Sequence, residues 1–225
     1  MTALRIVAVN AGLSEPSSTR LLIDRMVGAV TEQMGEGRVE VEIVDLRDLA
    51  VDLGQAMTVG FASGRARAAL DAVEGADALI VATPVFNASY SGLFKMFFDL
   101  VDIDAMAGKP VVIGATGGSP RHSMVLDHAL RPLFAYLRAV VLPTGVYAAS
   151  ADWAGADGDT TSLNDRIARA AGELVSLLTP RRGAAVTDVT VDGRQLSSAS
   201  AVTDGRRQAV EAAGIANFAK LLGTA

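Results

Sequence analysis

The stretch Ala78-Leu-Ile-Val-Ala82 places five apolar residues in succession. A second stretch, Val111-Val-Ile-Gly-Ala115, is apolar in the same way. Continuous apolar runs of this length are typical of parallel β-strands that are covered on both faces. Shorter apolar runs predict three more strands of the same sheet, at residues 5–9, 39–44 and 140–142.

Two segments outside these runs carry apolar residues at helical spacing. The first contains Leu22, Ile23, Met26, Val27, Val30 and Met34, and the second contains Leu163, Ile167, Ala170, Leu174 and Leu177. The alternation predicts an α/β fold, a doubly wound, five-stranded parallel sheet with helices on both faces, over residues 1–178. Beyond it the alternation fades. We interpret residues 179–225 as an arm or tail, with a candidate hairpin at 186–191 and a short helix at 208–222.

The composition excludes several classes of function. Half of the 225 residues are hydrophobic and 20% are charged, which suits a buried core. The net charge of −5 offers no basic surface for nucleic acid. Because there is no cysteine, disulfides, thiolate metal sites and iron–sulfur clusters are excluded, so any redox chemistry needs a bound cofactor. His122 and His128 are the only histidines, and no metal site is expected.

The sequence contains no apolar run near the ~18 residues that a membrane span needs. The N-terminal apolar run is also too short for a secretory signal. We therefore expect a cytoplasmic protein with no membrane contact.

Ligands of a doubly wound sheet bind beyond the carboxyl ends of its strands, where the strand order reverses. The candidate loops are those after the first, third and fourth strands. In the first, residues 10–19, the hydroxyls of Ser14, Ser17, Ser18 and Thr19 lie beside the unpaired N–H groups of a helix N-terminus, which suits a phosphate. An ordinary cap at Ser17 or Ser18 explains these residues equally well. The loop matches neither the dinucleotide fingerprint G-x-G-x-x-G nor the P-loop.

The second loop, residues 83–95, contains Pro84, Asn87, Ser89 and Gly92. These residues favour tight turns beside backbone donors and acceptors. Such a loop can hold a planar ring by its edge, and the alternative is an ordinary strand-to-helix connection.

The third loop, residues 116–120, contains Gly117 and Gly118. A flat ligand can lie against the bare backbone of two glycines. The alternative is a flexible turn.

Together the three loops resemble those of the NAD(P)H-dependent FMN reductases. The motifs that carry the resemblance are residues 12–19, 83–95 and 117–133, and residues 1–178 match in order and spacing. The branch that it resembles most supplies two-component monooxygenases, both those of alkanesulfonate utilisation and the actinobacterial, luciferase-like kind. The resemblance implies a flavodoxin-like fold, FMN as cofactor, and NADPH or NADH as co-substrate.

The resemblance also implies roles for the loop residues. Ser14, Ser17 and Thr19 would hold the FMN phosphate. Pro84–Asn87 would line the isoalloxazine ring and the ribityl chain, and Gly117–Ser119 would border the pyrimidine side of the ring. The residues expected to bind the cofactor are Ser14, Ser17, Ser18, Thr19, Pro84, Val85, Phe86, Asn87, Gly117, Gly118 and Ser119.

No side chain is expected to be catalytic, because hydride passes directly from nicotinamide C4 to flavin N5. His122, Ser123 and Asp127 lie too close together in sequence to form a hydrolytic triad, and we expect them on an exposed helix face.

The phosphate loop departs from the pattern of many relatives, which place an arginine inside it. This chain has Glu15, Pro16 and Ser18 at the interior positions, and Arg20 follows just outside. Neutral donors would favour weak, reversible FMN binding.

Two other functions stay open. A flavodoxin-like electron carrier would keep its FMN and meet protein partners. An NAD(P)H quinone or azo-dye reductase would keep its FMN while the acceptor varies. A reductase of the resembling branch would instead supply reduced FMN to a partner flavin-dependent monooxygenase.

A homodimer or homotetramer is also expected. The segment after the third strand carries apolar residues over about 200° of a helix, more than the ~100° that one buried face requires. These residues are Leu93, Phe94, Met96, Phe97, Phe98, Leu100 and Val101. The resemblance also points to such assemblies, with the flavin near the interface.

An irregular helix is expected around His128. Residues 123–138 have the pattern of one amphipathic helix, but Pro132 lacks an N–H and presses toward the carbonyl of His128. A kink or a single-turn π-bulge would accommodate it. In the resembling reductases this helix carries an inserted residue, often tyrosine, at the subunit interface beside the flavin, and His128 occupies the matching place.

Overall fold

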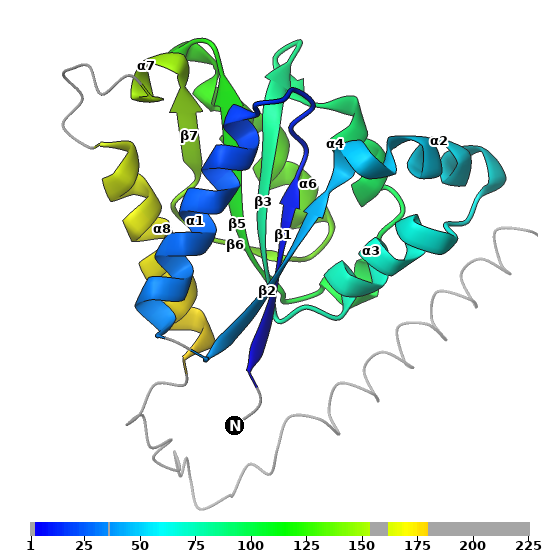
Figure 1. The fold of residues 1–225 in the computed structure, drawn as a ribbon, viewed down its shortest axis with the longest axis horizontal. Helices are drawn as coiled ribbons and strands as arrows, with labels where there is room; N and C mark the ends of the chain where they lie inside the picture. The colour runs from blue at the N-terminus through cyan, green and yellow to red at the C-terminus, as the bar shows by residue number, and fades with distance from the viewer. Residues whose placement is uncertain (1–2, 36, 154–161, 180–225) are drawn as a thin grey trace, which may run out of the picture. The chain divides into compact units, whose positions relative to one another are not determined.

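A parallel sheet runs through the part of the chain that the structure describes (Figure 1). The computed structural model describes residues 3–35, 37–153 and 162–179. The strands of the main path are β1 (Leu4–Asn10), β2 (Val39–Asp45), β3 (Ala78–Phe86), β5 (Pro110–Gly117) and β6 (Val140–Val141). Their spatial order, β2-β1-β3-β5-β6, is that of a flavodoxin-like doubly wound sheet. All five expected strands are therefore confirmed.

Two short strands were not expected. β4 (Ser89–Tyr90) pairs antiparallel with the end of β3. β7 (Val146–Ala149) pairs with the end of β5, whereas β6 pairs with its beginning. The fifth position of the sheet is therefore broken in two, because Pro143 lies between β6 and β7 and has no N–H for a ladder.

Helices cover both faces of the sheet, as expected. They are α1 (Ser18–Met34), α2 (Ala50–Val59), α3 (Gly64–Glu74), α4 (Gly92–Phe98), α5 (Ile103–Met106), α6 (Arg131–Tyr136), α7 (Ser150–Trp153) and α8 (Leu163–Leu178). α1 and α8 pack on one face, and α3, α4 and α6 pack on the other (Figure 1). On β1, Ile6 enters the first of these cores and Val7 the second, so successive residues are buried on opposite faces. This double burial explains the unbroken apolar runs.

The apolar residues of α4 are covered within the chain. Phe94, Phe97 and Phe98 are fully buried, and α2 packs against this helix (Figure 1). Of the seven apolar residues in this segment, none is exposed. Leu93, Met96 and Leu100 are partly buried and the other four are buried, so the chain itself covers most of this apolar arc, and the homo-oligomer stays a prediction.

The segment around His128 contains a π-helix at Leu126–Leu130. It follows a 3-10 helix at Pro120–Met124 and runs into α6. The backbone N–H of Arg131 donates to the carbonyl of Leu126, five residues back. The irregularity at His128 is thus confirmed, and it is the π-bulge rather than a simple proline kink.

The hairpin expected at residues 186–191 and the helix expected at 208–222 lie outside the described residues. The division of the chain near residue 179 stays a prediction.

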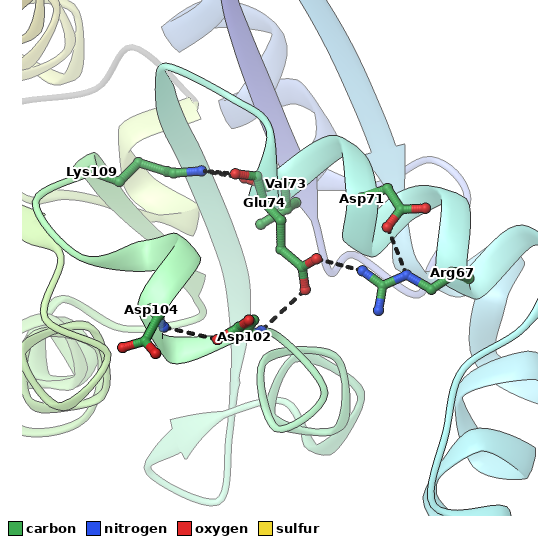
Figure 2. A network of polar contacts seen from close by, with 7 residues as sticks. All are labelled: Arg67, Asp71, Val73, Glu74, Asp102, Asp104 and Lys109. Atoms are coloured by element: carbon green, nitrogen blue, oxygen red, sulfur yellow. Dashed lines mark hydrogen bonds and ion pairs between the residues drawn. The ribbon is translucent and has the colours of Figure 1, made fainter.

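A polar network joins the ends of α3, α5 and β5 (Figure 2). Lys109 is buried, and its Nζ donates to the carbonyls of Val73 at 2.6 Å and Glu74 at 2.8 Å. The carboxylate of Glu74 accepts from Arg67 at 2.5 Å and from the backbone N–H of Asp102 at 3.1 Å. Lys109 thus supplies donors to the final carbonyls of α3, which have no partners inside the helix.

Replacing this buried donor should destabilise the fold. Lys109→Met removes the Nζ donor from both carbonyls, of which Val73 keeps a long bond from the N–H of Ala76 at 3.4 Å, and should lower the free energy of unfolding by about 2–3 kcal/mol. Lys95→Met, which removes only a surface ion pair with Asp99, should cost less than about 1 kcal/mol in urea denaturation.

The same pair of variants tests a pH effect. Desolvation lowers the pKa of Lys109 in the folded chain, so the unfolded chain binds this proton more tightly. Wild-type stability should therefore rise with pH in the range just below the ordinary lysine pKa of 10.5, and Lys109→Met should lose that rise. Equal losses of stability for Lys109→Met and Lys95→Met at every pH would contradict this role of Lys109.

A hydrogen bond between two buried hydroxyls links α1 to β5. The Oγ1 atoms of Thr19 and Thr116 lie 2.7 Å apart and share a hydrogen bond. The two residues are only 2% and 3% exposed. Neither hydroxyl can therefore turn to water if the other is removed.

The pair should show strong coupling in a double-mutant cycle. Thr116→Val leaves the hydroxyl of Thr19 buried without this partner and should cost about 1–3 kcal/mol. Thr19→Val/Thr116→Val removes both polar groups, and its unfolding free energy should return close to that of the wild type. Additive losses would show that the two hydroxyls act independently.

Candidate functional site

The three candidate loops lie along one edge of the sheet. In the parallel register Asn10 lies opposite Ala82, and Pro84 lies opposite Thr116. The chain leaves β1, β3 and β5 at this edge, at the upper end of the sheet in Figure 1. β1 has β2 on one side and β3 on the other, so the direction of winding reverses here, which is where such folds bind ligands.

The first loop closes tightly around Gly12. The side-chain oxygen of Asn10 accepts from the Gly12 N–H at 3.0 Å, and its nitrogen donates to Asp45 at 2.7 Å. A Cβ on Gly12 would lie 2.0 Å from Oγ of Ser17, so any other residue here would displace the capping hydroxyl. Asn10 was not singled out from the sequence, and its only signal is a polar side chain directly after an apolar run.

The four expected phosphate-binding residues divide into two groups. Ser14 and Ser18 are exposed and Ser17 is partly buried, at the N-terminus of the 17-residue helix α1. Ser17 is the cap, because its Oγ accepts from the N–H of Arg20 at 3.2 Å. Its proton is still available for an anion, so capping and phosphate binding are compatible. Thr19 is buried against Thr116, which leaves its backbone N–H as the group that can serve a phosphate.

Carboxylates engage the arginines near this loop. Arg20 pairs with Asp24 at 2.9 Å and with Asp45 at 2.6 Å. The hydrogen bond that Arg20 donates to Asp24 is the largest cause that raises the pKa of Arg20. Arg47 pairs with Glu15 at 3.0 Å. Both arginines are thus paired with acidic neighbours.

A pocket of about 430 Å³ opens on the β2 side of this loop. It is lined by Asn10, Gly12, Ser14, Glu15, Pro16, Ser17, Arg20, Leu21, Asp24, Asp45, Arg47 and Asp48. All of these residues belong to the first loop, to α1 or to the segment that ends β2. The other two candidate loops follow β3 and β5, on the opposite side of β1, so this pocket is not where they could hold a ring.

The second loop is a β-hairpin rather than a plain connection. β3 runs on to Phe86, turns at Asn87 and Ala88 with φ of 48° and 64°, and returns as β4. Positive φ at both central residues is typical of the tight hairpin turns that match strand twist. The buried hydroxyl of Thr83 in β3 accepts from the N–H of Ser91 at 3.0 Å and so links β3 to the start of α4.

The hairpin presents the expected ring-lining residues. Pro84 and Val85 are partly buried, and Phe86 and Asn87 are exposed. A strand was not expected here because Pro84 suggested the end of the ladder.

The third loop lies against Tyr147 of β7. The Tyr147 hydroxyl donates to the carbonyl of Ser119 at 2.7 Å. A Cβ on Gly117 would lie 2.4 Å from that hydroxyl oxygen and 3.5 Å from Nδ1 of His122. His122 is exposed, as expected, but it lies beside the glycine loop. Tyr147 was missed because β7 was missed.

The described residues hold no cluster of three or more acidic or histidine side chains that could bind a metal ion. No helix within them is long and apolar enough to cross a membrane.

Comparison with known proteins matches residues 4–154 to the family described as NADPH-dependent FMN reductase. The NADH-dependent FMN reductase SfnF of Pseudomonas fluorescens (strain Pf0-1) is 44% identical over 168 residues, which cover 75% of this chain and 88% of that protein. An FMN reductase (NADPH) of Pseudomonas aeruginosa is 41% identical over 149 residues, covering 66% and 78%. The crystal structure of an oxidoreductase from Corynebacterium diphtheriae is 48% identical, with a TM-score of 0.73 over 79% of this chain and 97% of that one.

The matched residues include all three loops at the carboxyl edge of the sheet. The resemblance inferred from those loops, with FMN as cofactor and NADPH or NADH as co-substrate, is confirmed at the level of the family. This chain belongs to the family of NADPH-dependent FMN reductases.

Proposed function

We propose that this chain reduces FMN with NADH or NADPH and releases the reduced flavin to a partner flavin-dependent monooxygenase. The observation that carries the proposal is the phosphate loop. Its available donors are serine hydroxyls and the N–H groups of the first turn of α1, and both nearby arginines are paired with carboxylates. Binding by neutral donors alone supports weak, exchangeable FMN, as a substrate rather than a resident group.

The residues of the three loops fit FMN. The dipole and free N–H groups at the start of α1 suit its phosphate, next to Ser17. The partly buried Pro84 and Val85 offer an apolar edge for the ring, and the exposed Phe86 and Asn87 extend it. When bound, FMN would supply the redox chemistry by accepting hydride from the nicotinamide.

The chain itself contributes orientation and electrostatics. The described residues provide no hydrogen-bond partner for the backbone N–H groups of Gly118 and Ser119. These two donors are suited to the negative charge that grows at N1–C2=O of a flavin as it is reduced. In this proposal no side-chain acid or base is required, because hydride passes directly between the nicotinamide and the flavin. Use of NAD(P)H suits a cytoplasmic protein.

The test follows oxidation of NADH and of NADPH at 340 nm while free FMN is titrated. The rate should rise and saturate with FMN, and the protein should lose its flavin on gel filtration. A rate indifferent to added FMN, with a bound yellow cofactor, would indicate a quinone or azo reductase. No turnover with either nicotinamide would indicate an electron carrier.

We propose further that the surface around the π-helix meets a second copy of the chain in a homodimer or homotetramer. His128 is exposed on the π-helix, and Met124 is exposed one turn before it. π-bulges gather at functional sites, which supports a role for this one beyond accommodating Pro132.

Deleting His128 should convert the π-helix to an α-helix. The N–H of Arg131 would then meet the Leu126 carbonyl four residues back instead of five. We expect an altered assembly state by sedimentation velocity and slower release of FMN by fluorescence. His128→Ala keeps the bulge and separates the side chain from the backbone geometry. If both variants keep the assembly state and FMN affinity of the wild type, His128 is only a surface residue.

A further inference from the structure

Tyr147 joins the edge strand β7 to the third loop. The residue is 7% exposed, and its hydroxyl donates to the carbonyl of Ser119 at 2.7 Å. The same carbonyl accepts from the backbone N–H of His122 at 3.1 Å. With two donors, both acceptor positions of this oxygen are used, and its direction is fixed.

The loop approaches Tyr147 too closely for any residue but glycine at position 117. A Cβ there would lie 2.4 Å from the hydroxyl oxygen and 3.4 Å from Cζ of the ring. Gly117 pairs with Ala149 in the parallel register of β5 and β7, two residues beyond Tyr147. The Tyr147 side chain therefore extends along the sheet beyond the β5–β7 pairing, and its hydroxyl contacts the third loop.

The loop needs such a restraint, because its middle residue has none of its own. Gly118 is exposed, and a Cβ added there would meet nothing within 4 Å. Glycine also has more backbone freedom to lose than any other residue. The Ser119 carbonyl belongs to the peptide bond of Pro120, which has no N–H. With the Ser119 carbonyl held by Tyr147, the groups of this loop that can donate to a ligand are the backbone N–H groups of Gly118 and Ser119.

We propose that Tyr147 is a positioning residue for flavin reduction: its hydroxyl holds residues 117–119 so that the Gly118 and Ser119 N–H groups are preorganised for the N1–C2=O edge of FMN. This inference rests on the proposed function. Preorganised donors stabilise developing charge without reorganising during the reaction. Burial raises the pKa of Tyr147, so the hydroxyl keeps the proton that it donates.

The main test compares Tyr147→Phe with Tyr136→Phe, which removes an exposed hydroxyl elsewhere. Tyr147→Phe should still fold but lower kcat about fivefold, the factor that one neutral hydrogen bond is worth, whereas the control should leave kcat unchanged. It should also weaken binding of reduced FMN more than of oxidised FMN, so that the reduction potential of bound FMN falls. With a merely structural tyrosine, the substitution would leave kcat and the ratio of the two affinities unchanged, whatever its effect on the melting temperature.

A second measurement uses the collision at Gly117. In the wild-type background Gly117→Ala should slow FMN reduction. In the Tyr147→Phe background the same substitution should slow it little further, because the phenylalanine ring has no hydroxyl to collide with the new methyl. If Tyr147→Phe retains kcat and both FMN affinities while the wild type turns over, the role of Tyr147 is refuted and the proposed function stands. If the wild type does not oxidise NAD(P)H with FMN, both fail.

Discussion

The parallel pairing of β1 with β3 is the interaction on which the remaining structure depends. It sets Asn10 opposite Ala82, and the ladder continues one residue further, with the N–H of Ala11 donating to Ala82 at 3.0 Å. The pairing places the ends of both strands at one edge, and β5 adds the third loop beside them. Since the sheet is buried on both faces, this edge is where its backbone can meet a ligand.

The chemistry of the edge comes from its loops rather than from the fold. The same strand order serves electron carriers and reductases alike, so function has to be argued from the site. Here the first loop offers neutral donors, whereas Arg20 and Arg47 are held by carboxylates. The third loop offers backbone N–H groups on a glycine backbone held by Tyr147. Together they support the proposal that the chain binds FMN, reduces it and releases it.

Local sequence patterns predicted most of the fold. Continuous apolar runs located the five main strands, and helical spacing located α1 and α8, because these signals need no knowledge of distant residues. Pro132 predicted the irregular helix for a local steric reason. The candidate loops also followed from their position after predicted strands.

The features that the sequence did not predict depend on contacts between residues that are far apart in the chain. β7 has only four residues and follows a break at Pro143, too short to show a period. Tyr147 meets Ser119 28 residues away, and Thr19 meets Thr116 97 residues away, so neither contact has a local signal. The cover that α2 gives to α4 is tertiary as well, which is why the wide apolar arc of α4 suggested a second subunit instead.

The most direct test of the flavin site is a crystal structure of the chain with FMN. The phosphate should contact the Ser17 hydroxyl and the N–H groups of Ser18 and Thr19, and the pyrimidine side of the ring should lie within hydrogen-bond distance of the Gly118 and Ser119 N–H groups. A phosphate held by Arg20 or Arg47 in the pocket on the β2 side, with the ring away from residues 117–119, would contradict the site described for this chain.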